Sequence, residues 1–163
     1  GDFINSVTRE NYGKSLYVVN IHFTEEYVVW RKREKGGGLI GTFESYEAAT
    51  KHLEAQGAAL EDHEITQTQS HLLLSKNPDT AVLNNTAFIM DFSSSKLRVS
   101  REWNTQINQL GGDRFSSLWK LTAVQTQNRA AQKFWNLSVE NQGWVLEADY
   151  EFAKGIYGSV KGA

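Results

Sequence analysis

Two runs of β-branched and aromatic residues near the start of the chain constrain its fold most. The runs are Leu16 to Phe23 (LYVVNIHF) and Glu26 to Lys32 (EYVVWRK), and Thr24-Glu25 separates them. Such residues are enriched in strands because they pack well on a pleated sheet, so the two runs predict a hairpin. Gly36-Gly37-Gly38 supplies the next turn, and Leu39 to Phe43 can return as a third strand. Three antiparallel strands are therefore expected to open the fold.

Three later segments have the pattern of helices. Ser45 is a typical N-cap residue and Gly57 a typical C-terminal stop, which predicts a helix between them. A second helix is predicted between Ser93-Ser94-Ser95 and Gly111-Gly112, where apolar residues recur at three- and four-residue spacing. Glu147 to Tyr157 has the apolar stripe of a third helix.

Further strands are predicted in the second half of the chain. One pair is joined by Asn77-Pro78-Asp79, which contains the single proline, and another by the polar turn Thr126 to Ala131. Alternation in the second pair predicts a face on which lysines lie beside aromatic rings. The expected strands are Ile65 to Leu74, Ala81 to Phe92, Phe115 to Gln125, Gln132 to Glu140 and the short segment Trp144 to Leu146.

The segment from Lys96 to Lys133 carries an excess of positive charge. Seven basic residues stand there against two acidic ones, whereas the whole chain has 17 basic and 19 acidic residues. Trp103, Trp119 and Trp135 lie in or beside the segment. Cations neutralise phosphates and flat rings stack on unpaired bases, so this mixture is typical of a surface for single-stranded nucleic acid. The alternative is a solvated charged surface with the tryptophans in the core.

The acidic residues are concentrated elsewhere, between Glu44 and Glu64. That segment has six acidic residues and one lysine, Lys51. Segregated charge predicts a molecule with one positive and one negative face. A second basic group, Arg31 to Lys35, adjoins the glycine run and Trp30, and we interpret it as a mobile basic finger.

Most catalytic chemistry has no signature in this chain. It contains no cysteine, which excludes disulfides, thiol catalysis and cysteine-ligated metal centres. Phosphate-binding glycine loops and the zinc-protease and serine-hydrolase motifs are also absent. A metal trap around His63 or a nuclease site using Asp79 and Asp91 are weaker alternatives, since no acidic-x-lysine motif completes the latter. We therefore expect a protein that is not an enzyme and has no cofactor or metal.

The sequence lacks the features of a membrane or exported protein. No apolar run approaches the roughly 18 residues of a membrane span, and the first residues have no basic start or apolar centre of a signal peptide. A soluble, cytoplasmic protein is expected.

Three strings carry a resemblance. They are SSSKLRVSREWN from Ser93 to Asn104, LWKLTAVQTQNRAAQKFWNLSVE from Leu118 to Glu140, and VVWRKREKGGGLIGTF from Val28 to Phe43. Together they resemble a family of phage-encoded proteins associated with single-stranded DNA binding. The sequence departs from that pattern where Arg129-Ala130-Ala131 replace a turn glycine, and its end, Ser159 to Ala163, is not an acidic tail.

The resemblance implies an oligonucleotide/oligosaccharide-binding (OB) barrel of five or more antiparallel strands. With the predicted helices added, the expected fold class is α+β, mainly β, in a single nucleic-acid-binding domain over residues 1–163. The implied function is sequence-independent binding of single-stranded DNA during phage replication and recombination in the host cytoplasm, with replication proteins as further partners. The alternative is a protein-interaction or virion module that binds no nucleic acid, and the oligomeric state stays open.

The expected binding surface combines tryptophans that stack on bases with cations that hold phosphates. Its members are Trp30, Arg31, Lys32, Arg33, Lys35, Arg98, Arg101, Trp103, Trp119, Lys120, Lys133 and Trp135.

Overall fold

The structure is a computed structural model, and it describes residues 2–6 and 8–161. It is mainly β, with a six-stranded antiparallel sheet, a separate two-stranded pair and three helices. The strands are β1 Phe3–Ile4, β2 Asn11–Gly13, β3 Ser15–Arg31, β4 Leu39–Phe43, β5 His63–Lys76, β6 Phe88–Ser93, β7 Ser117–Gln127 and β8 Lys133–Trp144, and the helices are α1 Tyr46–Ala55, α2 Leu97–Leu110 and α3 Glu147–Lys161.

β3 is one continuous strand of 17 residues, so the predicted hairpin at Thr24-Glu25 is wrong. Both residues pair with β5, Thr24 with Ser70 and Glu25 with Gln69. Neither has the positive φ that the tight two-residue hairpin turns require. Thr24 and Glu25 are therefore exposed residues within a long strand. β3 stays paired with β5 both before and after them.

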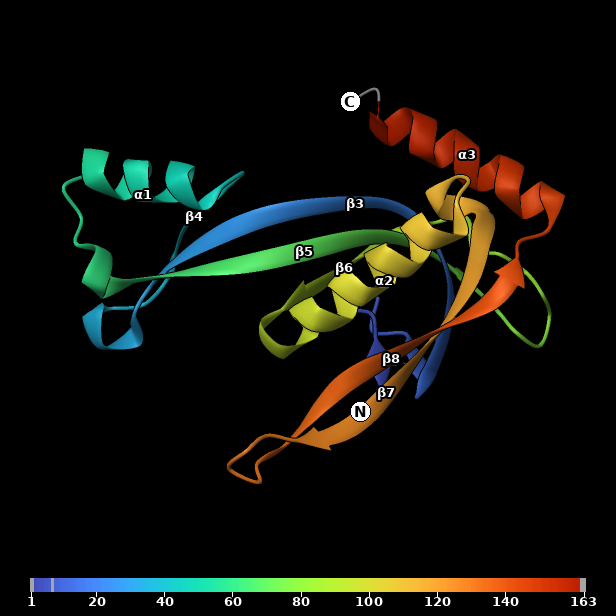
Figure 1. Cartoon of the computed structure of the whole chain (residues 1–163), viewed down its shortest axis with the longest axis horizontal. Helices are drawn as coiled ribbons and strands as arrows, with labels where there is room; N and C mark the ends of the chain where they lie inside the picture. The colour runs from blue at the N-terminus through green and yellow to red at the C-terminus, as the bar shows by residue number, and fades with distance from the viewer. Residues whose placement is uncertain (1, 7, 162–163) are drawn as a thin grey trace.

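The sheet divides into two parts because β3 changes partner along one edge. Its start, Ser15 to Val19, pairs with β7, and its end, Tyr27 to Trp30, pairs with β4. The pairing order is β6-β5-β3-β7-β8, with β4 beside the far end of β3. Figure 1 shows β3 and β5 as a long curved pair, with α1 and β4 at one end and α3 and the β7–β8 hairpin toward the other.

Three apolar clusters hold the helices on this sheet. Leu16, Val18 and Leu73 pack with α2 through Trp103, whereas the alternate residues Val19 and Leu74 pack with α3 on the other face. The third cluster joins α1 to the far end of β3 through Ala49, Leu53 and Val29. Two helices that are distant in the sequence, α2 and α3, thus cover the two faces of the sheet around the first half of β3.

The predicted helices are confirmed, and α1 shows why. Ser45 caps it as expected, because its Oγ accepts a hydrogen bond of 3.0 Å from the Ala48 N–H. The strand predicted from Ala81 to Phe92 is shorter, since only Phe88–Ser93 pairs with β5 over several residues. Among the described residues no pairing joins β6 to β8, so a closed OB barrel stays a prediction.

Candidate nucleic-acid interface

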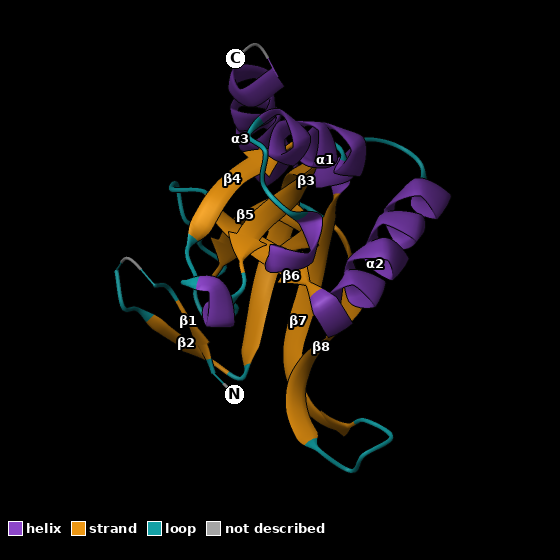
Figure 2. Cartoon of the chain, turned by 90° about the vertical axis from the view of Figure 1, so that its left-hand side faces the viewer, coloured by secondary structure: helices purple, strands orange, loops and turns teal. Residues whose placement is uncertain are grey.

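The β7–β8 hairpin extends beyond the rest of the sheet. The last residue of β7 that pairs with β3 is Thr122, whereas β7 and β8 stay paired with each other as far as Gln127 and Lys133. We call residues 123–137 the hairpin arm. Figure 2 shows this two-stranded ribbon projecting from the body of the molecule, with α2 beside its root.

The hairpin arm presents an aromatic ring together with positive charge. Trp135 lies opposite Gln125 and is 46% exposed, and Lys133 lies opposite Gln127 on the same face. No acidic residue occurs between Asp113 and Glu140, so every charged side chain of the arm is a cation. An exposed indole in a purely cationic setting suits an unpaired base and its phosphate.

The start of α2 lies at the root of the hairpin arm. The Asn136 side-chain amide on β8 donates to the backbone oxygen of Ser95, at 3.4 Å, just before the helix. This contact brings the first turn of α2, with Arg98, near the arm. The Arg98 guanidinium is already paired with Glu102 at 3.0 Å, and Arg101 donates to the Gln67 amide oxygen at 3.1 Å.

The second group of predicted site residues lies at the far end of β3. Trp30 is 43% exposed there, beside Arg31, and the chain continues into a short 3-10 turn that contains Arg33 and Lys35. Lys35 forms an ion pair with Asp62, at 3.7 Å, and the Lys32 N–H donates to the Asp62 backbone oxygen.

The acidic segment that ends at Glu64 therefore packs against the basic turn instead of forming a separate negative face. Glu64 itself pairs with Trp30 across the sheet. The expectation of two segregated faces is wrong at this end, because the pairing of β3 with β5 brings residues 62–64 beside residues 30–32. The cations here are partly neutralised.

Trp30 and Trp135, the predicted site tryptophans that are exposed, lie at opposite ends of the sheet. Trp30 is eleven residues along β3 from Val19, which pairs with Leu118, and Gln125, the partner of Trp135, is seven residues beyond Leu118. At about 3.3 Å per residue the path along the strands is about 60 Å. The curvature of the sheet shortens the direct line, but the residues predicted to share one surface form two groups.

Trp103 and Trp119 cannot serve as stacking platforms, which corrects the prediction for both. Each is 0% exposed, and their rings lie edge to face with centroids 6.0 Å apart in the core between α2 and the sheet. Neither indole N–H has a hydrogen-bond partner among the residues that the structure describes. The face of α2 that carries Trp103 and Ile107 is its apolar face, so burial of Trp103 follows from the same periodicity that predicted the helix.

Lys120 also lies away from the exposed ring on the arm. It pairs with Glu140, and its Nζ is 5.8 Å from the centre of the Tyr17 ring. Trp135 and Lys133 occupy the alternate positions of the hairpin, on the opposite face. The predicted face that combines lysines with aromatics therefore holds Lys133 and lacks Lys120.

The sequence did not predict a buried series of hydrogen-bonded polar side chains, which we call the polar chain. The Asn20 amide donates to His71 Nδ1 at 2.9 Å, and His71 Nε2 lies 2.7 Å from Ser100 Oγ. Ser100 Oγ donates to the Gln69 amide oxygen at 2.6 Å. The outer ends of the chain are charged: Gln69 donates to Glu25, and Asn20 accepts from Arg114.

This arrangement requires a neutral His71. Since Nδ1 accepts from the Asn20 amide, the proton sits on Nε2 and is donated to Ser100. Burial, and secondly the positive charge of Arg114, lower the pKa of His71 to about 3. The ring also stacks on Trp103, with centroids 4.8 Å apart. The polar chain is thus a structural element of the core beneath α2.

Other candidate chemistry finds no support in the described part of the chain. His63 is buried at the start of β5, and its Nδ1 lies 2.7 Å from the Ala59 carbonyl oxygen. Within residues 2–6 and 8–161, no group of three or more histidine and acidic side chains is placed to hold a metal ion. None of the helices in those residues has the length and apolarity needed to span a bilayer.

Comparisons with known proteins give one result. No curated protein and no solved structure matches the chain. The family model described as Pam3 phage gp34-like protein matches residues 1–163, the whole sequence. The chain is a phage protein and belongs to the Pam3 phage gp34-like family.

Proposed function

We propose that this phage protein binds single-stranded DNA without sequence preference and without catalysing a reaction, and that it acts in phage DNA replication or recombination in the host cytoplasm. The observation that carries the proposal is the hairpin arm, where the exposed Trp135 lies beside Lys133 with no acidic residue in the ribbon. Stacking on an aromatic ring is independent of base identity, because every base has a flat face.

The arm is the primary contact in this proposal. Trp135 stacks on a base, Lys133 and Arg129 neutralise phosphates, and Arg98 at the root of the arm exchanges Glu102 for a phosphate. A side-chain ion pair this exposed contributes little, so such an exchange has a low cost. Trp30 with Arg31, Lys32, Arg33 and Lys35 forms a secondary contact, weakened by Asp62 and Glu64.

Binding of single-stranded DNA is favoured over binding of duplex DNA because the arm offers a ring on which an unpaired base can stack. A two-stranded ribbon can also enter the major groove of B-DNA. In a duplex, however, the bases are already stacked, and Trp135 would gain no partner without opening the helix.

The test is fluorescence anisotropy of end-labelled oligo-dT of graded length, titrated with the full chain at low salt. We expect binding that weakens with salt, with a slope of about −0.7 for each phosphate neutralised. Unlabelled oligo-dT should compete far better than an unlabelled duplex of equal length. Absence of binding at low salt, or equal competition by the duplex, would contradict the proposal.

A further inference from the structure

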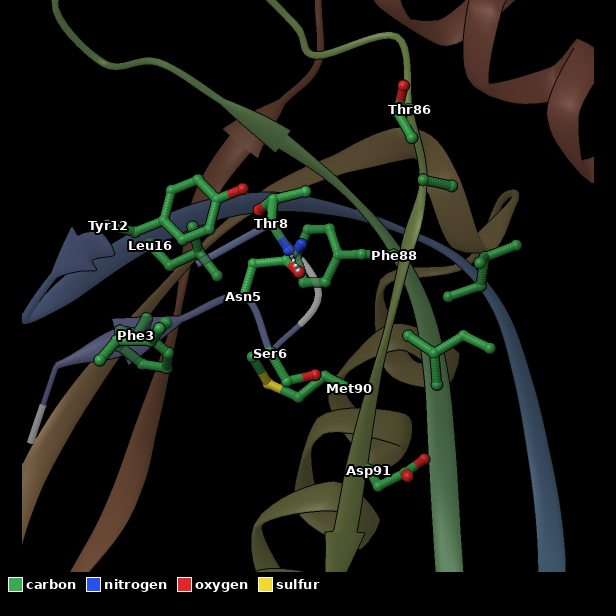
Figure 3. A pocket seen from close by; sticks show the side chains of 14 residues that line it. Phe3, Asn5, Ser6, Thr8, Tyr12, Leu16, Thr86, Phe88, Met90 and Asp91 are labelled. Carbon is green, nitrogen blue, oxygen red and sulfur yellow. Dashed lines mark hydrogen bonds between the residues drawn. The ribbon is translucent and has the colours of Figure 1, made fainter. Parts of the chain in front are cut away.

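A groove lies between the N-terminal strands and β6, the edge strand at the opposite end of the strand order from β8. Its volume is about 660 Å³, and its wall includes Phe3, Tyr12, Leu16, Phe88 and Met90. The Tyr12 and Phe88 rings are nearly parallel, with an interplanar angle of 17° and centroids 6.5 Å apart. Figure 3 shows these side chains around the hollow, with the polar side chains of residues 5, 6 and 8 beside them.

The groove runs along an unpaired strand edge. β6 is the last strand of the sheet, and no described residue pairs with its outer edge. Alternate backbone N–H and C=O groups of Phe88–Ser93 therefore point away from β5. An exposed edge of this kind can accept another strand, and a neighbouring pocket then selects side chains of that strand. Ile89, which is 66% exposed, adds apolar surface at the same edge.

The charge around the groove is negative and uncompensated. Asp91 lines it, and a second hollow of about 640 Å³ that shares Tyr12 and Leu16 is lined by Glu10 and Asp79. None of these three carboxylates has an ion-pair partner in the described part of the chain. Among the described lining residues of both hollows, the one lysine, Lys76, is paired with Asp149 at 2.7 Å. Phosphate groups would be repelled here.

We propose that this groove binds an extended peptide segment of a protein partner. The segment adds to the free edge of β6, places an apolar or aromatic side chain between Tyr12, Phe88 and Met90, and carries lysine or arginine next to that side chain. The inference is independent of DNA binding, because it concerns the opposite edge of the sheet and the opposite sign of charge.

The test starts from a library of displayed hexapeptides selected against the full chain. We expect enriched sequences with an aromatic or large aliphatic residue flanked by lysine or arginine. The consensus peptide is then titrated against the isotope-labelled protein, and amide shifts should be largest in Phe88–Ser93. Failure to enrich any sequence, acidic consensus peptides, or shifts confined to other elements would each overturn the proposal.

A surface variant tests the charge argument without disturbing the apolar wall. Asp91→Asn should weaken binding of the consensus peptide about two- to fivefold, the range of an exposed ion pair. Glu140→Gln on β8 is the matched control and should leave the affinity unchanged. Equal effects of both variants would overturn the proposed contact with Asp91, because only the net charge of the protein would then matter. Peptide at saturation should leave oligo-dT binding unaltered, so this proposal and the proposed DNA binding fail separately.

Discussion

The inner and outer halves of the β7–β8 hairpin both carry tryptophans, and these differ in exposure. In the inner half, Trp119 and Leu121 are fully buried against α2 and the start of β3. In the outer half, Trp135 is 46% exposed on a ribbon with which no third strand of the described residues pairs. A tryptophan on a strand is therefore a core residue where β3 and α2 cover it, and a surface residue a few positions beyond the end of that cover.

The two halves of the hairpin also differ in which of their residues are available for binding. The inner half is held by packing that a ligand cannot replace, whereas the outer half buries little and leaves its ring and cations in solvent. A two-stranded ribbon has no core of its own. Stability and ligand affinity should consequently respond to different substitutions in the same hairpin.

The largest expected effect is on stability, from Trp119→Ala. Removing a fully buried ring should lower the free energy of unfolding by about 3–5 kcal/mol. Urea unfolding monitored by circular dichroism measures this. Trp135→Ala is the matched variant in the outer half and should cost less than about 1 kcal/mol, since its ring is half exposed. Similar losses in both variants would break the comparison.

The next effect is the pH dependence contributed by the polar chain beneath α2. The pKa of His71 is about 3 in the folded protein and about 6.5 when unfolded, so the unfolded state binds the proton first. Stability from this group is full above about pH 6.5 and falls toward pH 3, by up to about 1.4 kcal/mol per pH unit.

Urea titrations at several pH values measure that slope, with His71→Gln as the comparison because glutamine does not titrate. We expect the variant to be less stable at neutral pH and to lose less stability on acidification. Parallel pH profiles for the two proteins would contradict the assignment of a neutral, buried His71.

The third effect is on affinity, from Trp135→Ala. Loss of one stacked base should weaken oligo-dT binding by about 1–3 kcal/mol, or roughly five- to 150-fold in Kd. Trp144→Ala is the control, because Trp144 is 68% exposed but lies at the other end of β8. Anisotropy titration measures both, and a larger loss in the control would move the interface away from the hairpin arm.

The smallest effect is on the salt dependence. Lys133→Gln should reduce the slope of log K against log salt by about 0.7, the value for one phosphate of a single strand. Lys51→Gln on α1, whose lysine is paired with Glu47 at 3.1 Å, should leave the slope unchanged. An unchanged slope in the Lys133 variant would remove that residue from the phosphate contacts.

Local sequence signals predicted most of the elements because their causes are local. The Ser45 cap, the apolar face of α2 and the glycine turn at residues 36–38 each depend on neighbours within a few positions. Where a boundary depends on a distant partner, prediction failed. Thr24-Glu25 has the local pattern of a turn, whereas the pairing of β3 with β5 over residues 63–76 that keeps it in a strand has no local signal.

The sequence predicted which residue types form the candidate site, but it did not predict where those residues lie in the fold. Composition alone identified cations interleaved with tryptophans, but alternation gives two faces without saying which one α2 covers. In the structure Trp103 and Trp119 are buried, and Lys120 lies over the Tyr17 ring. It also assembled Asn20, His71 and Ser100, from three elements, into one buried chain.

The sequence by itself determined that this chain forms a strand-rich domain with three helices and carries a cation-rich segment from Lys96 to Lys133, because those properties follow from residue type and spacing. Tertiary structure alone decided which rings reach solvent, which cations meet Asp62, and which sheet edges stay open. Exposure is set by what lies on top of a residue, and the covering segments come from parts of the chain that no local pattern connects.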